Sequence, residues 1–205
     1  MRLPSGQTGL YSVGMATTSP RERILAAANE LFYAEGVHTV GIDRVIEKAG
    51  VAKASLYAAF GSKDDLIKAY LEQRAAMRQA RWEATLAKPR HPRGKILAIF
   101  DMLGEVFDEP GFRGCAFARA TAEGAPAKVK KVCVDARAWT RSRFVELARD
   151  AKVRDPESFG AQLHLLYDGA MLRAQQTNDA DAAQTAKQIA SVLLDAERPA
   201  SRTGE

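Results

Sequence analysis

The sequence IDRVIEKAGVAKASLYAAF, residues 42–60, determines how the rest of the chain is interpreted. Its first half has apolar residues at the i, i+3, i+4 and i+7 spacing of a helix with one buried face, at Ile42, Val45, Ile46 and Ala49. Gly50 ends this helix, because glycine enters the left-handed backbone conformation without a steric penalty. A second helix begins within residues 52–55 and carries Leu56 and Phe60 on one face. The segment therefore predicts two short helices joined by a tight turn, which is the geometry of a helix-turn-helix.

A helix, a glycine and a second helix also occur in an ordinary helical hairpin. The flanking sequence favours the helix-turn-helix over that alternative. Upstream, RERILAAANELFYAEG at residues 21–36 has the apolar stripe of an amphipathic helix, and Ser19 and Pro20 are typical of its start. Downstream, FGSKDDLIKAYLEQR starts another helix. Its N-cap is Ser62, and two acidic residues follow in the first turn, where the helix dipole favours negative charge.

These three segments together resemble the DNA-binding domain of the TetR/AcrR family of bacterial transcriptional regulators. The resemblance covers residues 21–74 and is carried by ILAAANELFYAEG, AGVAKASLY and FGSKDDL. It implies an all-α homodimer, with an N-terminal three-helix helix-turn-helix DNA-binding domain and a C-terminal helical domain for ligand binding and dimerisation. The partners that it implies are double-stranded palindromic operator DNA and a small-molecule effector.

Composition sets broad limits on the class of protein. A net charge of +5 and a pI near 9.3 suit an anionic partner, although many soluble proteins share these values. The two cysteines, Cys115 and Cys133, cannot form a disulfide framework, so a cytoplasmic location is expected. No apolar run approaches the roughly 20 residues that span a bilayer, so no membrane partner is expected. Because the sequence lacks a glycine-rich phosphate loop, an HExxH motif, a nucleophile elbow and any metal-ligand spacing, we expect no enzyme activity, cofactor or metal.

Composition shifts along the chain predict its domain organisation. The first 19 residues mix Gly, Ser, Thr and Pro without periodicity, and Met15 is an alternative start. The sequence KPRHPRG, at residues 88–94, predicts a boundary between two domains. The expected divisions are a disordered tail at residues 1–19, a helix-turn-helix domain at 20–74 whose last helix continues to about residue 87, a ligand-binding and dimerisation domain at 88–197, and a polar tail at 198–205.

The second domain is expected to be helical throughout. Its predicted helices lie near residues 95–108, 115–122, 128–152, 156–177 and 181–197. Segments this apolar without β-type alternation argue against a sheet. The last two helices carry more apolar residues than a solvated face needs, and the family resemblance implies that they form a two-fold dimer interface.

Eight residues are candidates for DNA contact. They are Thr39, Arg44, Lys53, Ala54, Ser55, Tyr57, Ala58 and Lys63. Lys53 and Ser55 lie at the N-terminal end of the second helix of the motif, where they can donate to phosphates or base edges. The resemblance assigns Tyr57 and Lys63 to contacts with the DNA backbone.

Other members of this set have alternative interpretations. Thr39 either caps the first helix of the motif or contacts a phosphate there, and Arg44 faces outward from that helix. Ala58 and Ala59 stand where many relatives carry bulky aromatic or His residues, and alanine offers only an apolar contact, for instance with a thymine methyl. The operator sequence therefore cannot be taken from a relative.

The candidates for ligand contact are bulky apolar residues of the second domain and one histidine. They are Phe100, Leu103, Phe107, Phe117, Trp139, His164, Tyr167 and Met171. A close-packed core needs the same kinds of residue, so each is either core or cavity lining. His164 is either a satisfied buried histidine or a polar anchor for the ligand. The expected effector is small and mainly apolar.

The sequence leads us to expect a repressor that a ligand releases from its operator through its differential affinity for two states of the dimer. Three alternatives stay open. A transcriptional activator would share the fold. A redox or electrophile sensor would act through Cys115, because Arg113 and Arg119 supply the positive charge that activates a thiol. A helical ligand-binding protein would not engage DNA.

Overall fold

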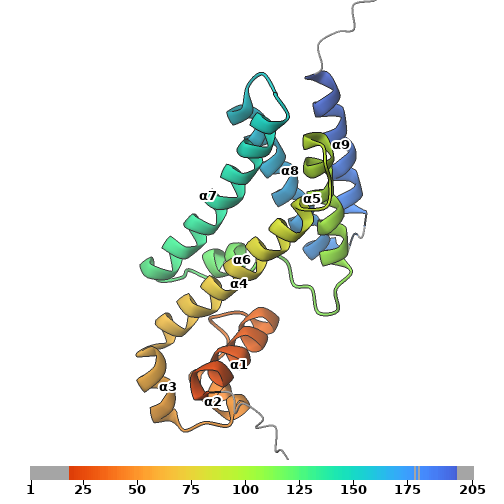
Figure 1. Cartoon of the computed structure of the whole chain (residues 1–205). Coiled ribbons are helices and arrows are strands. Elements are labelled where there is room, and N and C mark those ends of the chain that lie inside the picture. Colours follow the sequence, from red (N-terminus) through yellow and green to blue (C-terminus); the bar gives the residue numbers. More distant parts are fainter. Residues whose placement is uncertain (1–18, 178, 180, 198–205) are drawn as a thin grey trace, which may run out of the picture.

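The computed structural model describes residues 19–177, 179 and 181–197. Within these residues the chain forms nine α-helices and no strand, so the expected all-α fold is confirmed (Figure 1). The helices are α1 (Pro20–Glu35), α2 (Ile42–Ala49), α3 (Lys53–Phe60), α4 (Lys63–Leu86), α5 (Pro92–Phe107), α6 (Ala116–Ala122), α7 (Ala127–Asp150), α8 (Pro156–Thr177) and α9 (Ala182–Ala196). The two predicted tails fall outside the described residues, except for Ser19.

Local sequence signals fix the start of α1, the end of α2 and the start of α4. Ser19 forms a capping box with Glu22 at the start of α1, and Ser62 accepts a hydrogen bond from the backbone N–H of Asp65 at 3.1 Å at the start of α4. Gly50 has a φ of 61° and joins α2 to α3 in the left-handed conformation. These three predictions are confirmed.

One predicted cap is wrong. The N-cap of α2 is Gly41, and no side chain caps this helix. Thr39 lies two residues earlier, in the turn that follows α1, and is exposed there. A cap must directly precede the first helical residue for its oxygen to reach the free N–H groups of the first turn, so Thr39 is too far upstream.

The long helix α4 joins two apolar cores. Figure 1 shows it running from α1–α3 at one end of the molecule to α5, α8 and α9 at the other. The first core combines α1–α3 and the start of α4 with residues of α6 and α7, among them Phe117, Val129 and Cys133. The second core combines Trp82 and Leu86 of α4 with α5, α7, α8 and α9. The helix break before Pro92 therefore does not separate the two cores.

Aromatic side chains organise the second core around Trp82. Its ring centroid lies 5.5 Å from that of Trp139, 5.0 Å from Phe144 and 5.8 Å from Tyr167. Phe100 stacks on Phe144, with 6.1 Å between the ring centroids. Such offset and edge-on pairs add to the free energy gained by burying the rings. The cluster fixes α4, α5, α7 and α8 against one another.

Helices α7 and α8 approach closely where α8 has no side chain. A Cβ added to Gly160 would lie 2.5 Å from Cγ2 of Val145 and 2.8 Å from its backbone nitrogen. Only glycine fits at this position without a shift of α7. Elsewhere, α8 and α9 expose large apolar side chains, namely Leu165, Leu172, Ile189 and Val192.

Candidate functional site

Helix α3 presents its outer face to solvent at the end of the molecule remote from α9 (Figure 1). Leu56 is fully buried in the first core, whereas the next residue, Tyr57, is 46% exposed. Lys53, Ala54 and Ala58 are also exposed, and Ser55 is half-buried. A helix anchored by one buried leucine and free on its other side has the shape that enters a DNA major groove.

Two basic residues near α3 already pair with carboxylates of the same chain. Lys53 Nζ lies 2.9 Å from Asp43 Oδ1, and both terminal nitrogens of Arg44 donate to the Glu35 carboxylate, at 2.6 and 2.8 Å. The hydrogen bond to Asp43 raises the pKa of Lys53, and the hydrogen bond to Glu35 raises the pKa of Arg44. Both side chains are therefore cations at neutral pH that pair with carboxylates of the chain itself.

The predicted DNA contacts come together from three helices and one turn. Lys63, at the start of α4, approaches the turn that contains Thr39, with its Nζ 3.5 Å from the carbonyl oxygen of His38. Lys53, Ala54, Ser55, Tyr57 and Ala58 lie on α3 and Arg44 on α2. Sequence reasoning did not anticipate the carboxylates of Glu35 and Asp43, because their pairing depends on how the helices cross.

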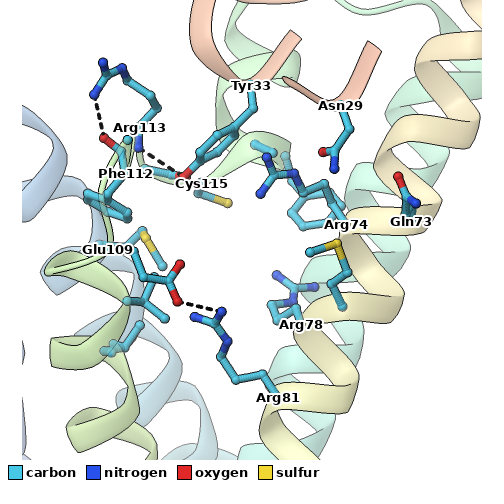
Figure 2. A pocket seen from close by; sticks show the side chains of 18 of the residues that line it. Asn29, Tyr33, Gln73, Arg74, Arg78, Arg81, Glu109, Phe112, Arg113 and Cys115 are labelled. Atoms are coloured by element: carbon cyan, nitrogen blue, oxygen red, sulfur yellow. Dashed lines mark hydrogen bonds and ion pairs between the residues drawn. The ribbon is translucent and has the colours of Figure 1, made fainter. Parts of the chain in front are cut away.

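A cavity of about 660 Å³ lies between α1, α4, α5, α7, α8 and the loop before α6. This volume is typical of sites for small molecules. Five of the eight predicted ligand contacts line it: Leu103, Phe117, His164, Tyr167 and Met171. Figure 2 shows the side chains of α4 along one side, with Glu109, Phe112 and Cys115 opposite.

The structure does not place Phe100, Phe107 or Trp139 in the cavity wall. Phe100 and Trp139 pack into the aromatic cluster around Trp82 and Phe144, and Phe107 contacts Phe112 at 5.1 Å between ring centroids. Apolar residues of one helix divide between core and cavity according to the neighbour that each meets. That division depends on tertiary packing, which spacing alone does not specify.

Sequence reasoning missed a row of arginines on the α4 side of the cavity (Figure 2). Arg74, Arg78 and Arg81 follow one another at i, i+4 and i+7, so they share one helix face. Arg81 pairs with Glu109 at 2.7 Å. Arg74 stacks on the Tyr33 ring at 3.7 Å from its centroid, and Arg78 stacks on the Phe117 ring at 4.6 Å. The spacing was visible in the sequence, but arginines on a long helix are ordinarily solvated.

Tyr33 connects α1 to the loop that precedes α6. Its hydroxyl donates to the carbonyl oxygen of Gly114 at 3.1 Å and accepts from the backbone N–H of Arg113 at 3.0 Å. Arg119 Nη1 of α6 donates to the Tyr33 carbonyl oxygen at 2.6 Å, and the backbone N–H of His38 donates to Glu123 at 2.9 Å. The helix that supports α2 and α3 is therefore hydrogen-bonded to the segment around the cavity.

Comparison with known proteins agrees with this geometry. Residues 24–70 match the model of the bacterial regulatory proteins of the tetR family. The solved structure of SCO4454, a TetR-family transcriptional regulator from Streptomyces coelicolor, is 32% identical, with a TM-score of 0.81 over 87% of this chain and 95% of that chain. The chain belongs to the TetR family.

Two further relatives place it within this family. A TetR-type regulator from Streptomyces avermitilis is also 32% identical, with a TM-score of 0.78 over 87% of this chain and 98% of that chain. The transcriptional activator FasR of Mycolicibacterium smegmatis is 34% identical over 98 residues, which are 45% of this chain and 43% of FasR. Matches to the curated relatives span between 36% and 60% of their lengths. This TetR-family protein is thus a DNA-binding transcriptional regulator and not an enzyme.

None of the helices in the described part of this TetR-family chain is both long and apolar enough to cross a membrane.

Proposed function

We propose that this regulator is a homodimeric repressor that binds a palindromic operator and is released when a small effector occupies the cavity. The observation that carries the proposal is the position of the cavity between α1, which supports α2 and α3, and the helices α4, α5 and α8. A ligand there touches both parts of the molecule. It can therefore favour one arrangement of α3 over another through its differential contacts with the two.

The DNA contacts follow from side-chain chemistry and exposure. Tyr57 and Lys63 bind backbone phosphates, Lys53 and Ser55 contact phosphates or base edges, and Arg44 adds a contact from α2. Thr39 binds a phosphate beside Lys63, since the Nζ atom of Lys63 approaches the turn that contains Thr39. Ala54 and Ala58, both exposed on α3, offer apolar contacts to thymine methyl groups.

The dimer forms through α8 and α9. Leu165 is 74% exposed and Val192 is 68% exposed in the single chain, and Leu172 and Ile189 extend the same apolar surface. Apolar surfaces of this kind on adjacent helices mark association sites in soluble proteins. A two-fold pairing of these helices places the two copies of α3 on one side of the dimer, where each enters one half-site.

The release mechanism acts through Tyr33. Its ring lies under the Arg74 guanidinium, and its hydroxyl bonds the loop at residues 113–114. A ligand that displaces or tightens either contact changes the position of α1 relative to α6. Because α2 and α3 pack on α1, this change alters the distance between the two copies of α3 in the dimer.

Selection of DNA from a random pool by the full chain tests the proposal. We expect one palindromic sequence to be enriched, and its binding to weaken steeply as salt rises, because phosphate contacts release counterions. Small molecules that fill the cavity should then lower operator affinity. Failure to enrich any sequence, or binding of duplex DNA that no salt concentration affects, would contradict the proposal.

Two further functions have specific observations in their favour. FasR, with which the chain shares 34% identity over 98 residues, is an activator, and a transcription assay with and without effector distinguishes activation from repression. Cys115 is half-buried in the cavity wall, which suits an electrophile sensor, whereas burial raises the pKa of the Cys133 thiol and makes it less reactive. Loss of the response to an electrophile in Cys115→Ser would favour the sensor.

A further inference from the structure

The charges around the cavity do not balance. Its wall contains three carboxylates, and each already has a cationic partner: Glu30 with Lys48 at 2.7 Å, Glu109 with Arg81 at 2.7 Å, and Asp168 with Arg137 at 2.6 Å. The other lining arginines are Arg74, Arg78 and Arg113. In the described part of the chain, none of these three pairs with a carboxylate. The cavity therefore has an excess of positive charge.

Aromatic stacking holds two of these arginines in place without neutralising them. Arg74 lies over Tyr33 and Arg78 over Phe117, and Nη2 of Arg78 donates to the carbonyl oxygen of Ala136 at 2.6 Å. The Nε atoms of both arginines are buried and have no hydrogen-bond partner among the described residues. Both arginines line the cavity, so a ligand there meets their positive charge.

Two amide side chains, Asn29 and Gln73, line the cavity with the arginines. The side-chain oxygens of Asn29 and Gln73 are buried and have no partner within the described residues, and both side chains line the cavity. An amide group presents either a donor or an acceptor by turning over. Figure 2 shows Asn29 approaching the Arg74 side of the cavity from α1. A polar ligand group bound beside Arg74 would therefore also lie near α1.

His164 lies in the wall of the same cavity. Burial lowers its pKa, the Asp168 carboxylate opposes this shift, and the guanidinium groups of Arg137, Arg78 and Arg141 lower the pKa further. Burial is the largest of these effects and favours the neutral imidazole, so the sign of the ligand's charge follows from the arginines and not from this histidine.

Much of the remaining wall is apolar. Met102, Leu103, Val106, Phe112 and Met171 line it, together with the ring of Tyr167. A ligand that fits both parts has one anionic group and an apolar body. A carboxylate matches the guanidinium best, because its two oxygens accept parallel hydrogen bonds from the planar fork.

We propose that the cavity binds a small organic carboxylate, whose anionic group pairs with Arg74 and Arg78 and whose apolar body lies against α5 and α8. Its description as the effector rests on the proposed function, but the binding itself does not. The expectation of a mainly apolar effector is thereby refined to one with a single negative charge.

Matched probes that differ only in charge test this proposal. Calorimetric titration of the full chain would use benzoate, 2-naphthoate and decanoate, each beside its neutral amide. We expect at least one carboxylate to bind saturably, with a Kd at least tenfold lower than that of its amide. Absence of saturable binding by all three carboxylates, or equal affinity for a carboxylate and its amide, would overturn the proposal.

Variants test which residues of the protein bind the anionic group of the ligand. Replacing Arg74→Gln and Arg78→Gln together should raise the Kd of the carboxylate at least tenfold and leave that of the amide within twofold. The double lysine variant keeps the charge without the fork, and should lose less affinity. Arg149→Gln removes an exposed arginine that pairs with Glu157 outside the cavity, and should change nothing. Unchanged carboxylate affinity in a folded double glutamine variant would place the anion elsewhere and refute the assignment.

The titration, together with a measurement of operator affinity in the presence of the same probes, separates this proposal from the repressor proposal. Titration without DNA measures the carboxylate site alone. Carboxylate binding that leaves operator affinity unchanged would support the anion site and contradict its role in release. Release by neutral amides with no preference for carboxylates would support the ligand-responsive regulator and contradict the anion site.

Discussion

Single side chains on α3 and at the start of α4 determine how the protein binds DNA in our proposal. Tyr57 is exposed beside the fully buried Leu56, so its hydroxyl is free to reach a phosphate while its backbone is fixed by the core. We predict that Tyr57→Phe weakens binding to all operator sequences about threefold to tenfold, because the variant loses one hydrogen bond worth about 1 kcal/mol. Fluorescence anisotropy with the selected operator measures this, and unchanged affinity would remove Tyr57 from the contacts.

Lys63 gives a second prediction, with a matched control on the same helix. Its Nζ is near the carbonyl oxygen of His38, whereas Lys68 pairs with Glu72 at 2.6 Å. Lys63→Ala should lower operator affinity and reduce the slope of log affinity against log salt by about 1, as expected for one lost phosphate contact. Lys68→Ala should leave the slope unchanged. Equal slopes in the two variants would show that Lys63 contacts no phosphate.

His164 gives the stability of the protein a dependence on pH. Burial lowers its pKa below the ordinary value of 6.5, so the unfolded chain binds a proton near pH 6.5 that the folded chain binds only at lower pH. The free energy of unfolding should therefore fall as pH drops below about 6.5. The carboxyl groups of Glu22, Glu35 and Asp65 have lowered pKa values, and their contribution is lost only below about pH 4.5.

We predict that His164→Gln reduces the fall in Tm between pH 7.5 and pH 5.5. The comparison is between the two slopes, so a uniform loss of stability in the variant does not affect it. Thermal unfolding followed by circular dichroism provides the measurement. A variant whose Tm falls as steeply as that of the parent chain would show that another group titrates in this range.

At the scale of the helix, the packing of α8 on α7 depends on a residue without a side chain. We predict that Gly160→Ala lowers the free energy of unfolding by about 1–3 kcal/mol, because the new methyl group overlaps Val145. Gly104→Ala is the control, since its Cβ would lie 3.8 Å from that of Ala183, an ordinary contact. Urea denaturation measures both. A Gly160→Ala variant as stable as the control would mean that α7 shifts at little cost.

Helix positions were largely predictable because their signals are local. The predicted bounds of the helix at residues 156–177 are those of α8, and Ser19, Gly50 and Ser62 act where expected. The start of α5 was predicted at residue 95, after the glycine of KPRHPRG, but it lies at Pro92. Proline is well suited to the first position of a helix, so the residue that suggested a break also begins the next helix.

The site was predictable only in part. The exposed residues of α3 follow from helical spacing around Leu56, but the cavity depends on which face of α4 meets the rest of the molecule. A helix of 24 residues has polar side chains on several faces, so Arg74 and Arg78 could not be distinguished from solvated arginines. Phe107 shows the converse, since it is large and apolar but does not line the cavity.

At the scale of the whole molecule, the proposed dimer makes a direct prediction. The double substitution Leu165→Glu and Val192→Glu places charges on the exposed apolar faces of α8 and α9. Burying these carboxylates in an interface would cost free energy. Light scattering should then report the monomer mass of 22.3 kDa in place of twice that value. Val134→Glu, at a residue 64% exposed on α7, is the control and should remain dimeric. A dimeric double variant would place the interface elsewhere.

The first core, which α1–α4 share with α6 and α7, restricts how the protein can be divided. Phe117, Val129 and Cys133 are buried against α1–α4, so a fragment cut after Leu86 would leave that surface open to water. Grafting the operator specificity of this protein onto another sensor therefore requires α6 and the beginning of α7 to be transplanted too. A chimera joined at the KPRHPRG segment would contain α3 but would lack the residues of α6 and α7 that complete its core.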